Sequence, residues 1–450
     1  MKKVLLIGAG LSTQKLVPYL LQLVNTHHIL LRVVDKELSI AQRAVETMPS
    51  GCTVGALDIT DENALFNEME SVDITISMVP AHMHMLVAKT CLRCNSHLIT
   101  ASYLTKDMES LQHETLDKGL VFLNECGLDP GIDHMSAMQL IEEIRSKGGR
   151  IKLFESFTGG LLSPDSEGKN PWRYKFTWNP RNVVLAGQGG AVKFLQEGKY
   201  KYIPPHMVFR RTEFMNVEGY GRFEGLANRD SLKYKEAYGL TQIETLYRGT
   251  LRRPGYARAW DCFVRLGMTD DTYVIKGLKD MSFRDFTNLF LAYNPSDSVE
   301  LKLKYYLSIP QDSEIFAKLE WAGIFSDQKF DFDEATPAKC LEFILRKVWT
   351  MSPEDKDLIV MYHKIGWEQG KDRFMLESSM GVEGENAQNT AMAGTVGLPL
   401  GIATKIVLEG KAPAGVQRPM TKEWYRPILS ELAEKYGVRF TEKQVDYTGY

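Results

Sequence analysis

The first residues whose types and spacing suggest chemistry are Gly8-Ala9-Gly10, near the start of the chain, and the acidic Asp35. Gly8 would permit a tight turn, and Gly10 would let the backbone approach a pyrophosphate at the start of a helix. Thr13 stands where such loops have a third small residue, so we expect helix and strand to pack slightly further apart. The candidate dinucleotide-binding residues of this loop are Gly8, Gly10, Leu11 and Ser12.

Asp35 ends a second strand-like run, where it would accept hydrogen bonds from both hydroxyls of an adenosine ribose. A carboxylate at this position would also repel the 2′-phosphate of NADP. The neighbouring Lys36 would partly neutralise such a phosphate. We therefore expect NAD as the cofactor, with Asp35 and Lys36 beside its ribose, and keep NADP as the alternative.

Three further segments follow predicted strands, at the edge where ligands of parallel sheets bind. The segment at Asp58 is expected near the adenine, the one at Ser77 near the nicotinamide ribose and the one at Ser102 near the nicotinamide ring. Each also has a plain interpretation as a loop. The candidate cofactor residues in these segments are Asp58, Ile59, Ser77, Val79, Pro80 and Ser102.

The elements that must position these residues form a regular alternation. Apolar strand-like runs alternate with helical patterns over roughly the first 125 residues, and the runs are 4–7, 29–35, 53–57, 73–77, 97–100 and 120–123. This order is typical of a doubly wound parallel sheet, the α/β Rossmann fold.

The pattern changes after Gly127-Leu128-Asp129-Pro130-Gly131. A helix near 134–147 leads into a stretch rich in glycine, proline and aromatic residues, with strand-like pieces at 152–158 and 206–212, which indicates a second, α+β domain. Helical patterns dominate from 282 to 349, including a helix from Pro337 capped by Thr336. Two strands at 357–367 and 372–378 and two helices at 390–409 and 423–436 follow.

Composition excludes several classes of function. The chain has 450 residues, 44% of them hydrophobic, and a formal net charge of −3, which is typical of a soluble globular protein of two or three domains. No basic field indicates nucleic acid or a membrane surface as a partner. The apolar run at 398–408 contains Pro399 and Lys405, which favours a buried helix over a membrane span.

The cysteines and histidines suggest no metal site. The six cysteines are scattered, which fits a reducing, cytoplasmic environment rather than a disulfide framework. Cys91 and Cys94 form a lone CxxC that closes a helix, and we interpret them as structural. His82 and His84 have the wrong spacing to share one helical face.

Several longer motifs resemble one enzyme family. The stretch 124–134, NECGLDPGIDH, resembles a signature of saccharopine dehydrogenases of the glutamate-forming type, also called saccharopine reductases. Further stretches similar to family motifs occur in order at 100–103, 159–161, 170–178, 228–231 and 248–252. The stretch at 159–161 has the motif in altered form. The ordered matches cover about residues 1–255, with weaker similarity to the end.

The resemblance implies a fold in three parts. The first is a Rossmann domain over 1–130, with the segment at about 390–450 packing back on it. The second is an α+β substrate and dimerisation domain over 131–280 and 351–389. The third is a helical subdomain over 281–350. The resemblance implies a homodimer. It also implies a reversible reaction of lysine metabolism. Glutamate and 2-aminoadipate 6-semialdehyde condense to an imine, and a nicotinamide hydride reduces this imine to saccharopine.

Saccharopine carries three carboxylates, which arginine forks would bind in a plane. Arg229 and Arg252 lie in matching motifs and are the first candidates, with Thr250 and Leu251 beside them. Lower-ranked candidates, each with a surface salt bridge as the alternative, are Arg173, Arg248 and Arg253. Leu128 and Thr177, also in matching motifs, are further expected cofactor contacts.

By family position, Asp129 and Tyr103 are the candidate catalytic residues, and with Ser102 they are also expected to contact substrate. A carboxylate there would steady a cationic amine and manage its proton, although Asp129 precedes Pro130 and has an alternative role in a turn. Thr158 stands where the family commonly has cysteine, so no essential thiol is expected. His134 follows Asp133, and two interpretations stay open: His134 contacts substrate, or, as the plainer alternative, Asp133 caps a helix.

Two other functions stay open. A carboxyspermidine or carboxynorspermidine dehydrogenase would need acidic residues where saccharopine needs arginines, and the motifs at 228–231 and 248–252 argue against it. A non-catalytic Rossmann dinucleotide sensor would need no substrate arginines. The physiological direction, lysine synthesis or degradation, does not follow from the residues.

Overall fold

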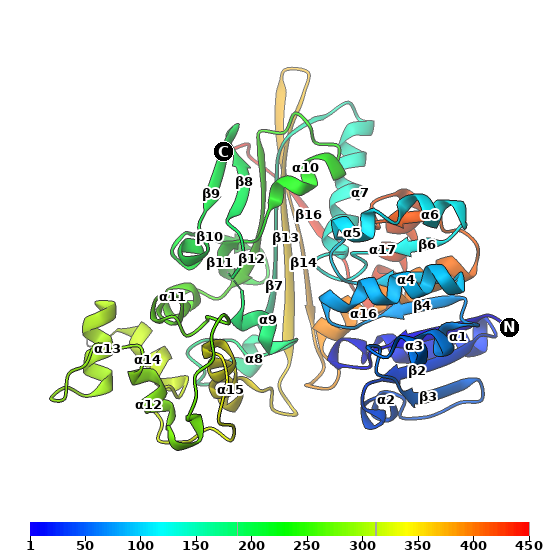
Figure 1. Cartoon of the computed structure of the whole chain (residues 1–450). Coiled ribbons are helices and arrows are strands. Elements are labelled where there is room, and N and C mark those ends of the chain that lie inside the picture. Colours follow the sequence, from blue (N-terminus) through cyan, green and yellow to red (C-terminus); the bar gives the residue numbers. More distant parts are fainter. Residues whose placement is uncertain (187, 311–312, 450) are drawn as a thin grey trace. The chain divides into compact units, whose positions relative to one another are not determined.

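The computed structural model describes residues 1–186, 188–310 and 313–449, which divide into two compact units. Unit 1 comprises Met1–Gly149 and Gln388–Phe440, and unit 2 comprises Arg150–Ala387 and the segment from Thr441 onward (Figure 1). The sequence suggested three parts with a boundary near residue 130, whereas the structure places 131–149 in unit 1 and groups 281–350 with unit 2.

Unit 1 is built on a parallel sheet with the strand order β15-β6-β5-β4-β1-β2-β3. The chain order reverses between β1 and β4, and this switch point is where sheets of this kind bind ligands, at the carboxyl ends of the strands. The predicted parallel sheet is confirmed. The strands are β1 (Lys3–Ile7), β2 (Leu30–Asp35), β3 (Cys52–Ala56), β4 (Ile74–Ser77), β5 (His97–Thr100), β6 (Val121–Leu123) and β15 (Gly415–Gln417).

The helices of unit 1 connect these strands and bring the C-terminal segment onto them. Several begin at a residue that caps them, such as Asp61, whose side chain accepts from the N–H groups of Asn63 and Ala64. The helices are η1 (Leu11–Thr13), α1 (Leu16–Thr26), α2 (Leu38–Ala44), α3 (Glu62–Met69), η2 (Ala81–Met83), α4 (His84–Cys94), α5 (Lys106–Glu109), α6 (Gln112–Asp117), α7 (Ile132–Ser146), α16 (Ala391–Leu408) and α17 (Lys422–Tyr436).

Helix α16 is the apolar segment that the sequence placed in the core. It is long and apolar enough to span a membrane, yet 78% of it is buried inside the structure. Its glycines allow close packing: a Cβ added at Gly397 would lie 3.0 Å from the carbonyl oxygen of Ser12 and from Cβ of Leu16. The helix is therefore a core element of unit 1 that supports the glycine loop from behind.

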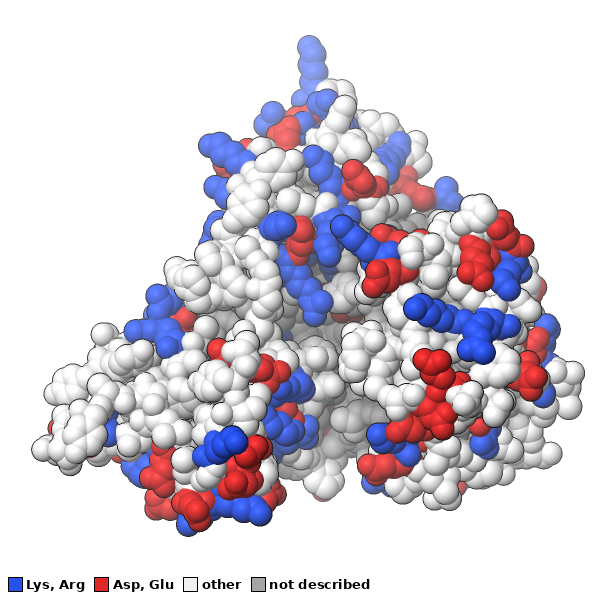
Figure 2. Space-filling view, in the orientation of Figure 1, with Lys and Arg blue, Asp and Glu red and all other residues white. Residues whose placement is uncertain are grey.

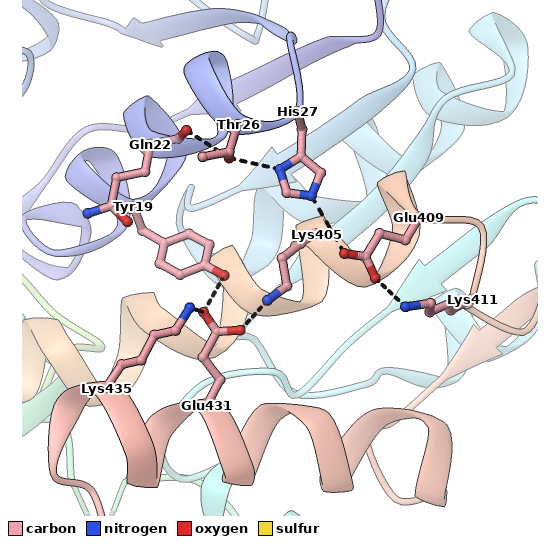
Figure 3. Close-up of polar contacts among 9 residues, drawn as sticks. All are labelled: Tyr19, Gln22, Thr26, His27, Lys405, Glu409, Lys411, Glu431 and Lys435. Atoms are coloured by element: carbon pink, nitrogen blue, oxygen red, sulfur yellow. Dashed lines mark hydrogen bonds and ion pairs between the residues drawn. The ribbon is translucent and has the colours of Figure 1, made fainter.

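A polar network joins three helices of unit 1 (Figure 3). The carboxylate of Glu431 on α17 accepts a hydrogen bond from the hydroxyl of Tyr19 on α1 at 3.0 Å and from Lys435 at 3.0 Å. It also forms an ion pair with Lys405 on α16. Burial by itself raises the pKa of Glu431, but these hydrogen bonds lower it below the ordinary value. The network holds the C-terminal helices to the N-terminal one.

Unit 2 is built on a mixed sheet around the long strand β7. The order is β10-β11-β12-β7-β13-β14-β16, and β8 pairs with both β12 and β9. Strand β7 pairs parallel with β12 and antiparallel with β13, and β13 and β14 form the long hairpin seen in Figure 1. The strands are β7 (Arg150–Leu162), β8 (Val192–Gln196), β9 (Lys199–Ile203), β10 (Thr212–Val217), β11 (Gly221–Ala227), β12 (Thr245–Arg252), β13 (Asp357–Gln369), β14 (Asp372–Glu383) and β16 (Thr441–Val445).

The helices of unit 2 share one aromatic core. Trp172 stacks on Phe263 with ring centroids 5.8 Å apart and meets Trp349 edge-on at 5.2 Å, and its indole N–H donates to the carbonyl oxygen of Lys318 at 2.7 Å. These contacts join the segment at Trp172 to helices α11, α14 and α15. The helices are α8 (Pro164–Glu167), α9 (Pro180–Val184), η3 (Pro205–Arg210), η4 (Ser231–Lys233), α10 (Tyr234–Ala237), α11 (Tyr256–Leu266), η5 (Leu278–Asp280), α12 (Phe283–Asn288), α13 (Val299–Leu307), α14 (Glu314–Trp321) and α15 (Pro337–Trp349).

One predicted strand is wrong. The segment 206–212 is mostly the 3-10 helix η3, which follows Pro204 and has Pro205 in its first turn, because proline fixes φ and removes the N–H that a strand would use. The cap predicted for α15 is confirmed, since Thr336 accepts from the N–H of Lys339.

Candidate functional site

The glycine loop has the backbone that a dinucleotide needs. Gly8 has φ of +93°, and a Cβ there would lie 2.8 Å from the carbonyl oxygen of Met78. A Cβ at Gly10 would meet no atom within 4 Å, so the space beside this backbone is open. Thr13 is buried, and its hydroxyl donates to the carbonyl oxygen of Gly10 at 2.7 Å. The loop thus fits a pyrophosphate, with Leu11 and Ser12 at its rim.

Asp35 turns its carboxylate toward the glycine loop. One oxygen accepts from the N–H of Ala9 at 2.8 Å and the other from the N–H of Glu37 at 3.3 Å. Lys36 points to a different acid, forming an ion pair with Asp58 at 3.0 Å. Hydrogen bonds from Thr60 and Lys36 lower the pKa of Asp58 to about 2. The adenosine end of the predicted site is therefore polar, with Ile59 buried beneath it.

The ends of β4 and β5 are tied together by a histidine. Ser77 ends β4, and its hydroxyl lies 2.9 Å from Nδ1 of His84. Nε2 of the same ring lies 2.6 Å from the hydroxyl of Ser102, which follows β5. Ser77 and Ser102, predicted to face the nicotinamide, therefore lie in one hydrogen-bond network through His84. Val79 and Pro80 lie in the connection between Ser77 and His84.

The loop at 127–131 presents Asp129 in front of helix α7. A Cβ at Gly127 would lie 2.9 Å from Cβ of Ala101, so the two loops pack closely. The hydroxyl of Tyr103 donates to a carboxylate oxygen of Asp129 at 3.4 Å. Asp129 is half-buried, and Leu128 beside it is buried. The structure thus brings together the two residues that the sequence proposed as catalytic.

Glu125 holds the Tyr103 loop in place from the inside. This buried carboxylate accepts from the N–H of Leu104 at 2.9 Å, pairs with His134 at 2.8 Å and pairs with Arg418 at 3.0 Å. Burial by itself raises the pKa of Glu125, but the hydrogen bond from His134 and the charge of Arg418 lower it to about 2. Sequence reasoning assigned no role to Glu125. Its signal was its place inside the NECGLDPGIDH motif.

Arg252 is the best-placed cation of unit 2 for an anionic ligand. It is 7% exposed, and within the described residues it forms no ion pair and its Nε has no hydrogen-bond partner. Its guanidinium lies over the rings of Tyr174 and Tyr256, 5.0 and 5.3 Å from the centroids. A buried cation without an acidic partner is costly, which favours a ligand carboxylate as its counterion.

The other candidate arginines have different surroundings. Arg173 and Arg253 both pair with Glu167, and burial lowers the pKa of Arg253. Arg248 is buried with its guanidinium 4.2 Å from the centroid of Tyr234. Arg229 is exposed in the turn after β11 and has φ of +52°. The ion pairs with Glu167 favour a structural role for Arg173 and Arg253, which was the alternative to substrate binding for these residues.

The remaining predicted residues lie on the same strands or beside them. Thr250 and Leu251 precede Arg252 on β12, and Thr250 pairs with Thr158 of β7. Thr177 is buried, and its hydroxyl has no hydrogen-bond partner among the described residues. The structure gathers the cofactor candidates other than Thr177, together with Asp129 and Tyr103, in unit 1 and places the arginines in unit 2.

His84 is a second residue that sequence reasoning missed, because we weighed it only as a metal ligand beside His82. Its position at the first turn after strand β4 was the available signal. The described residues contain no group of three His, Cys, Asp or Glu side chains placed to hold a metal. On the face shown in Figure 2, acidic and basic side chains are intermixed over both units.

A doubly wound sheet, a glycine turn at its switch point and an acidic end of β2 define a nicotinamide dinucleotide-binding protein of the oxidoreductase type. Residues 4–123 match the model of the saccharopine dehydrogenase NADP binding domain, and residues 127–438 match that of the saccharopine dehydrogenase C-terminal domain. The chain belongs to the saccharopine dehydrogenase family, and the resemblance seen in its motifs is confirmed.

Curated relatives extend over the whole chain. Saccharopine dehydrogenase [NADP(+), L-glutamate-forming] of Saccharomyces cerevisiae is 32% identical over 99% of each chain. The mitochondrial alpha-aminoadipic semialdehyde synthase of Rattus norvegicus is 32% identical over 96% of this chain and 46% of that protein. The latter similarity shows that a chain of this kind also occurs as part of a longer protein.

Solved structures agree with the fold. The apo saccharopine dehydrogenase (L-Glu forming) from Saccharomyces cerevisiae superposes with a TM-score of 0.87 and 30% identity, covering 99% of this chain and 100% of that one. The homospermidine synthase from Legionella pneumophila, solved with NAD, has a TM-score of 0.54 at 13% identity over 99% of this chain and 92% of that one, which shows the fold alone.

Proposed function

We propose that this protein interconverts saccharopine with L-glutamate and 2-aminoadipate 6-semialdehyde, a step of lysine metabolism. The observation that carries the proposal is Arg252, a buried cation without an acidic partner among the described residues, in a chain whose full-length relatives bear this activity in their names. A substrate with several carboxylates supplies the missing counterions. A polyamine substrate would instead leave this cation facing another cation.

The chain's own residues then have distinct tasks. Arg252 and Arg229 bind substrate carboxylates, and Thr250 and Leu251 shape the strand that carries Arg252. The carboxylate of Asp129, hydrogen-bonded to Tyr103, steadies the cationic amine and takes part in its proton transfer. A bound nicotinamide supplies hydride transfer, and the protein's contribution is orientation rather than strong acid or base chemistry.

The test is saccharopine oxidation followed at 340 nm, with Asp129→Ala and Arg229→Ala beside the unaltered protein. We expect both variants to lose at least tenfold in kcat/KM, which is the scale of one lost charged hydrogen bond. Near-unaltered oxidation of saccharopine in both variants would remove this assignment of the site. Absence of turnover in the unaltered protein, with a polyamine-derived substrate accepted instead, would contradict the proposed function.

We propose NADP(H) as the cofactor, with Lys36 as the ligand of its 2′-phosphate. Support comes from the names of the full-length relatives and of the domain that residues 4–123 match. These names oppose the expectation of NAD, which rested on Asp35. In the structure the Asp35 carboxylate accepts from the loop N–H groups of Ala9 and Glu37, so it has a structural task besides any contact with ribose.

The cofactor proposal is tested by kcat/KM for NAD and NADP in the unaltered protein and in Lys36→Ala. We expect a preference for NADP that falls in the variant, because a cation beside the phosphate is lost. Asp35→Asn serves as the matched change at the neighbouring acidic residue. It removes the negative charge, keeps one oxygen that can accept from the loop N–H groups, and should raise NADP turnover. A preference for NAD that is lost in Asp35→Asn would restore the interpretation of Asp35 as the deciding residue.

We also propose a homodimer in the cytoplasm. The strands β9 and β10 expose large aromatic side chains, among them Tyr200, Tyr202 and Phe214, which favours a self-association surface on unit 2. All six cysteines are unpaired, which fits a reducing compartment. Sedimentation equilibrium should give twice the 51.0 kDa mass of the chain, and a monomer at micromolar concentration would contradict the dimer.

A further inference from the structure

His84 occupies an unusual place between two hydroxyl groups at the ligand-binding edge of the sheet. The side chain is 5% exposed and begins helix α4. Nδ1 lies 2.9 Å from Oγ of Ser77, and Nε2 lies 2.6 Å from Oγ of Ser102. Since β4 and β5 pair in register with Ser77 opposite Thr100, the ring bridges two neighbouring strand ends.

The ring carries one proton near neutral pH. Burial, and to a lesser degree the charge of His82, lowers the pKa of His84 to about 4. One ring nitrogen is therefore a donor and the other an acceptor. Which nitrogen carries the proton follows from the hydrogen bonds that the two serines can make.

Ser77 decides the tautomer. It is fully buried, and among the described residues its hydroxyl has no hydrogen-bond partner other than Nδ1 of His84. If Nδ1 were protonated, the hydroxyl proton of Ser77 would be buried without an acceptor, which is costly. Ser77 therefore donates to Nδ1, and the proton of the ring lies on Nε2, which donates to Ser102.

We propose that His84 is a positioning residue that makes the Ser102 hydroxyl a donor toward the bound ligand. Because Nε2–H occupies a lone pair of Ser102, the hydroxyl proton of this half-buried serine is left to point away from the ring. Its acceptor is an oxygen of the ligand, either a carboxylate of the amino-acid substrate or the carboxamide of the nicotinamide. This inference rests on the proposed function for the identity of that substrate.

Two amide substitutions separate the two ends of the ring. In His84→Gln the amide nitrogen lies near the place of Nε2 and still donates to Ser102. In His84→Asn the amide lies near the place of Nδ1, so it keeps Ser77 and loses Ser102. We expect His84→Asn to lower kcat/KM for saccharopine about tenfold, the scale of one hydrogen bond, and His84→Gln to lower it less than about threefold.

The kinetic constants also identify the acceptor. A raised KM for saccharopine with an unchanged Kd for NADPH, measured by nicotinamide fluorescence, assigns the donor to the substrate carboxylate. A raised Kd for NADPH assigns it to the carboxamide. In a Ser102→Ala background His84→Asn should cost nothing further, because the hydroxyl that it orients is gone. Equal losses in both amide variants, or additive losses with Ser102→Ala, would overturn the proposal.

The tautomer is measured without any substrate. In the unaltered protein labelled with ¹⁵N-histidine, the resonances that vanish in His84→Gln should show an unprotonated Nδ1 and a protonated Nε2 at pH 7. A protonated Nδ1 would overturn the inference whether or not saccharopine is oxidised. Conversely, the expected tautomer together with no saccharopine turnover would contradict the proposed function alone.

Discussion

Arg252 and Arg253 are neighbours in sequence, but their guanidinium groups have opposite surroundings. Arg253 pairs with Glu167 and donates to the carbonyl oxygen of Tyr220 at 3.1 Å, whereas Arg252 has no ion-pair partner among the described residues. The first arrangement stabilises the fold. The second leaves a buried charge without an acidic partner, an energetic cost that a bound anion would remove.

Replacing each arginine by methionine should separate these two roles. We expect Arg252→Met to raise KM for saccharopine at least tenfold while leaving the free energy of unfolding unchanged or higher, because an unpaired buried charge is removed. The matched Arg253→Met should lower the free energy of unfolding by about 3 kcal/mol, because Glu167 and the Tyr220 carbonyl lose a buried partner. Urea unfolding and steady-state kinetics measure both effects. Similar losses of stability in the two variants would contradict the distinction.

Glu125 makes the stability of unit 1 depend on pH. Its pKa falls from an ordinary 4.5 to about 2 in the fold, so its contribution is fully present above pH 4.5 and is lost as pH falls toward 2. We expect Glu125→Gln to lower the free energy of unfolding by about 3 kcal/mol at pH 7 and by progressively less as pH falls from 4.5. Urea unfolding at pH 3 to 7 measures this.

The control for Glu125 is Glu109→Gln, which removes a second acidic partner of Arg418. Glu109 is 49% exposed in its side chain, so solvent screens the pair and the loss should stay under about 1 kcal/mol at every pH. A constant difference between Glu125→Gln and the unaltered protein from pH 7 to 3 would show that the carboxylate is not held in its charged form.

The roles of single residues were predictable from sequence where a recognisable motif indicates the chemistry of each position. Gly8 and Asp129 are examples, because a turn glycine and a motif carboxylate can be recognised without coordinates. Arg253 was not separable from Arg252, because the partner that distinguishes them, Glu167, lies far away in the sequence. His84 was missed because its two partners come from different strand ends, and only the parallel register brings them together.

At the scale of elements, helix α16 and the glycine loop depend on each other. Gly397 faces the backbone of Ser12 and Leu16, while a Cβ at Gly394 on the same helix would lie no closer than 3.9 Å to any atom. One glycine is therefore needed for close packing and the other is not. The loop predicted to bind the pyrophosphate takes its position partly from a helix near the other end of the chain.

The two glycines give a matched pair of alanine variants. Gly397→Ala should push the loop away from α16, lower the free energy of unfolding by about 1 to 3 kcal/mol and raise Kd for NADPH. Gly394→Ala should stabilise the helix by up to about 1 kcal/mol with Kd unchanged, since alanine is the better helix former and finds open space. Fluorescence titration with NADPH measures the binding, and equal Kd values in both variants would contradict the coupling.

Most elements of the first 149 residues follow from apolar periodicity alone, because strands buried on both faces read as continuous runs. Strand β15 did not, since Gly415 to Gln417 is too short to give a pattern and exists only by pairing with β6. The segment 206–212 has the composition of a strand, but Pro204 and Pro205 direct it into a 3-10 helix. Local propensity failed where proline or a distant partner decides the conformation.

At the scale of the whole molecule, the candidate residues are divided between two units, and this division predicts where each ligand acts. Hydrogen exchange should show that NADPH slows amide exchange in unit 1, at residues 8–13 and 77–84. Saccharopine should slow it at residues 228–231 and 248–253 of unit 2, and also around Asp129 in unit 1, where we propose that the substrate amine lies. Protection by NADPH confined to unit 2 would contradict the assignment of the cofactor to the parallel sheet.

Both units are built from segments that are distant in the chain, and this has a consequence for protein synthesis. Helices α16 and α17 and strand β15 leave the ribosome only after nearly all of unit 2, and β16, which pairs with β14, follows them. A nascent chain therefore carries two incomplete domains with apolar surfaces such as the α1 face that α16 will cover. Products of premature termination should be substrates for chaperones and proteases rather than stable fragments.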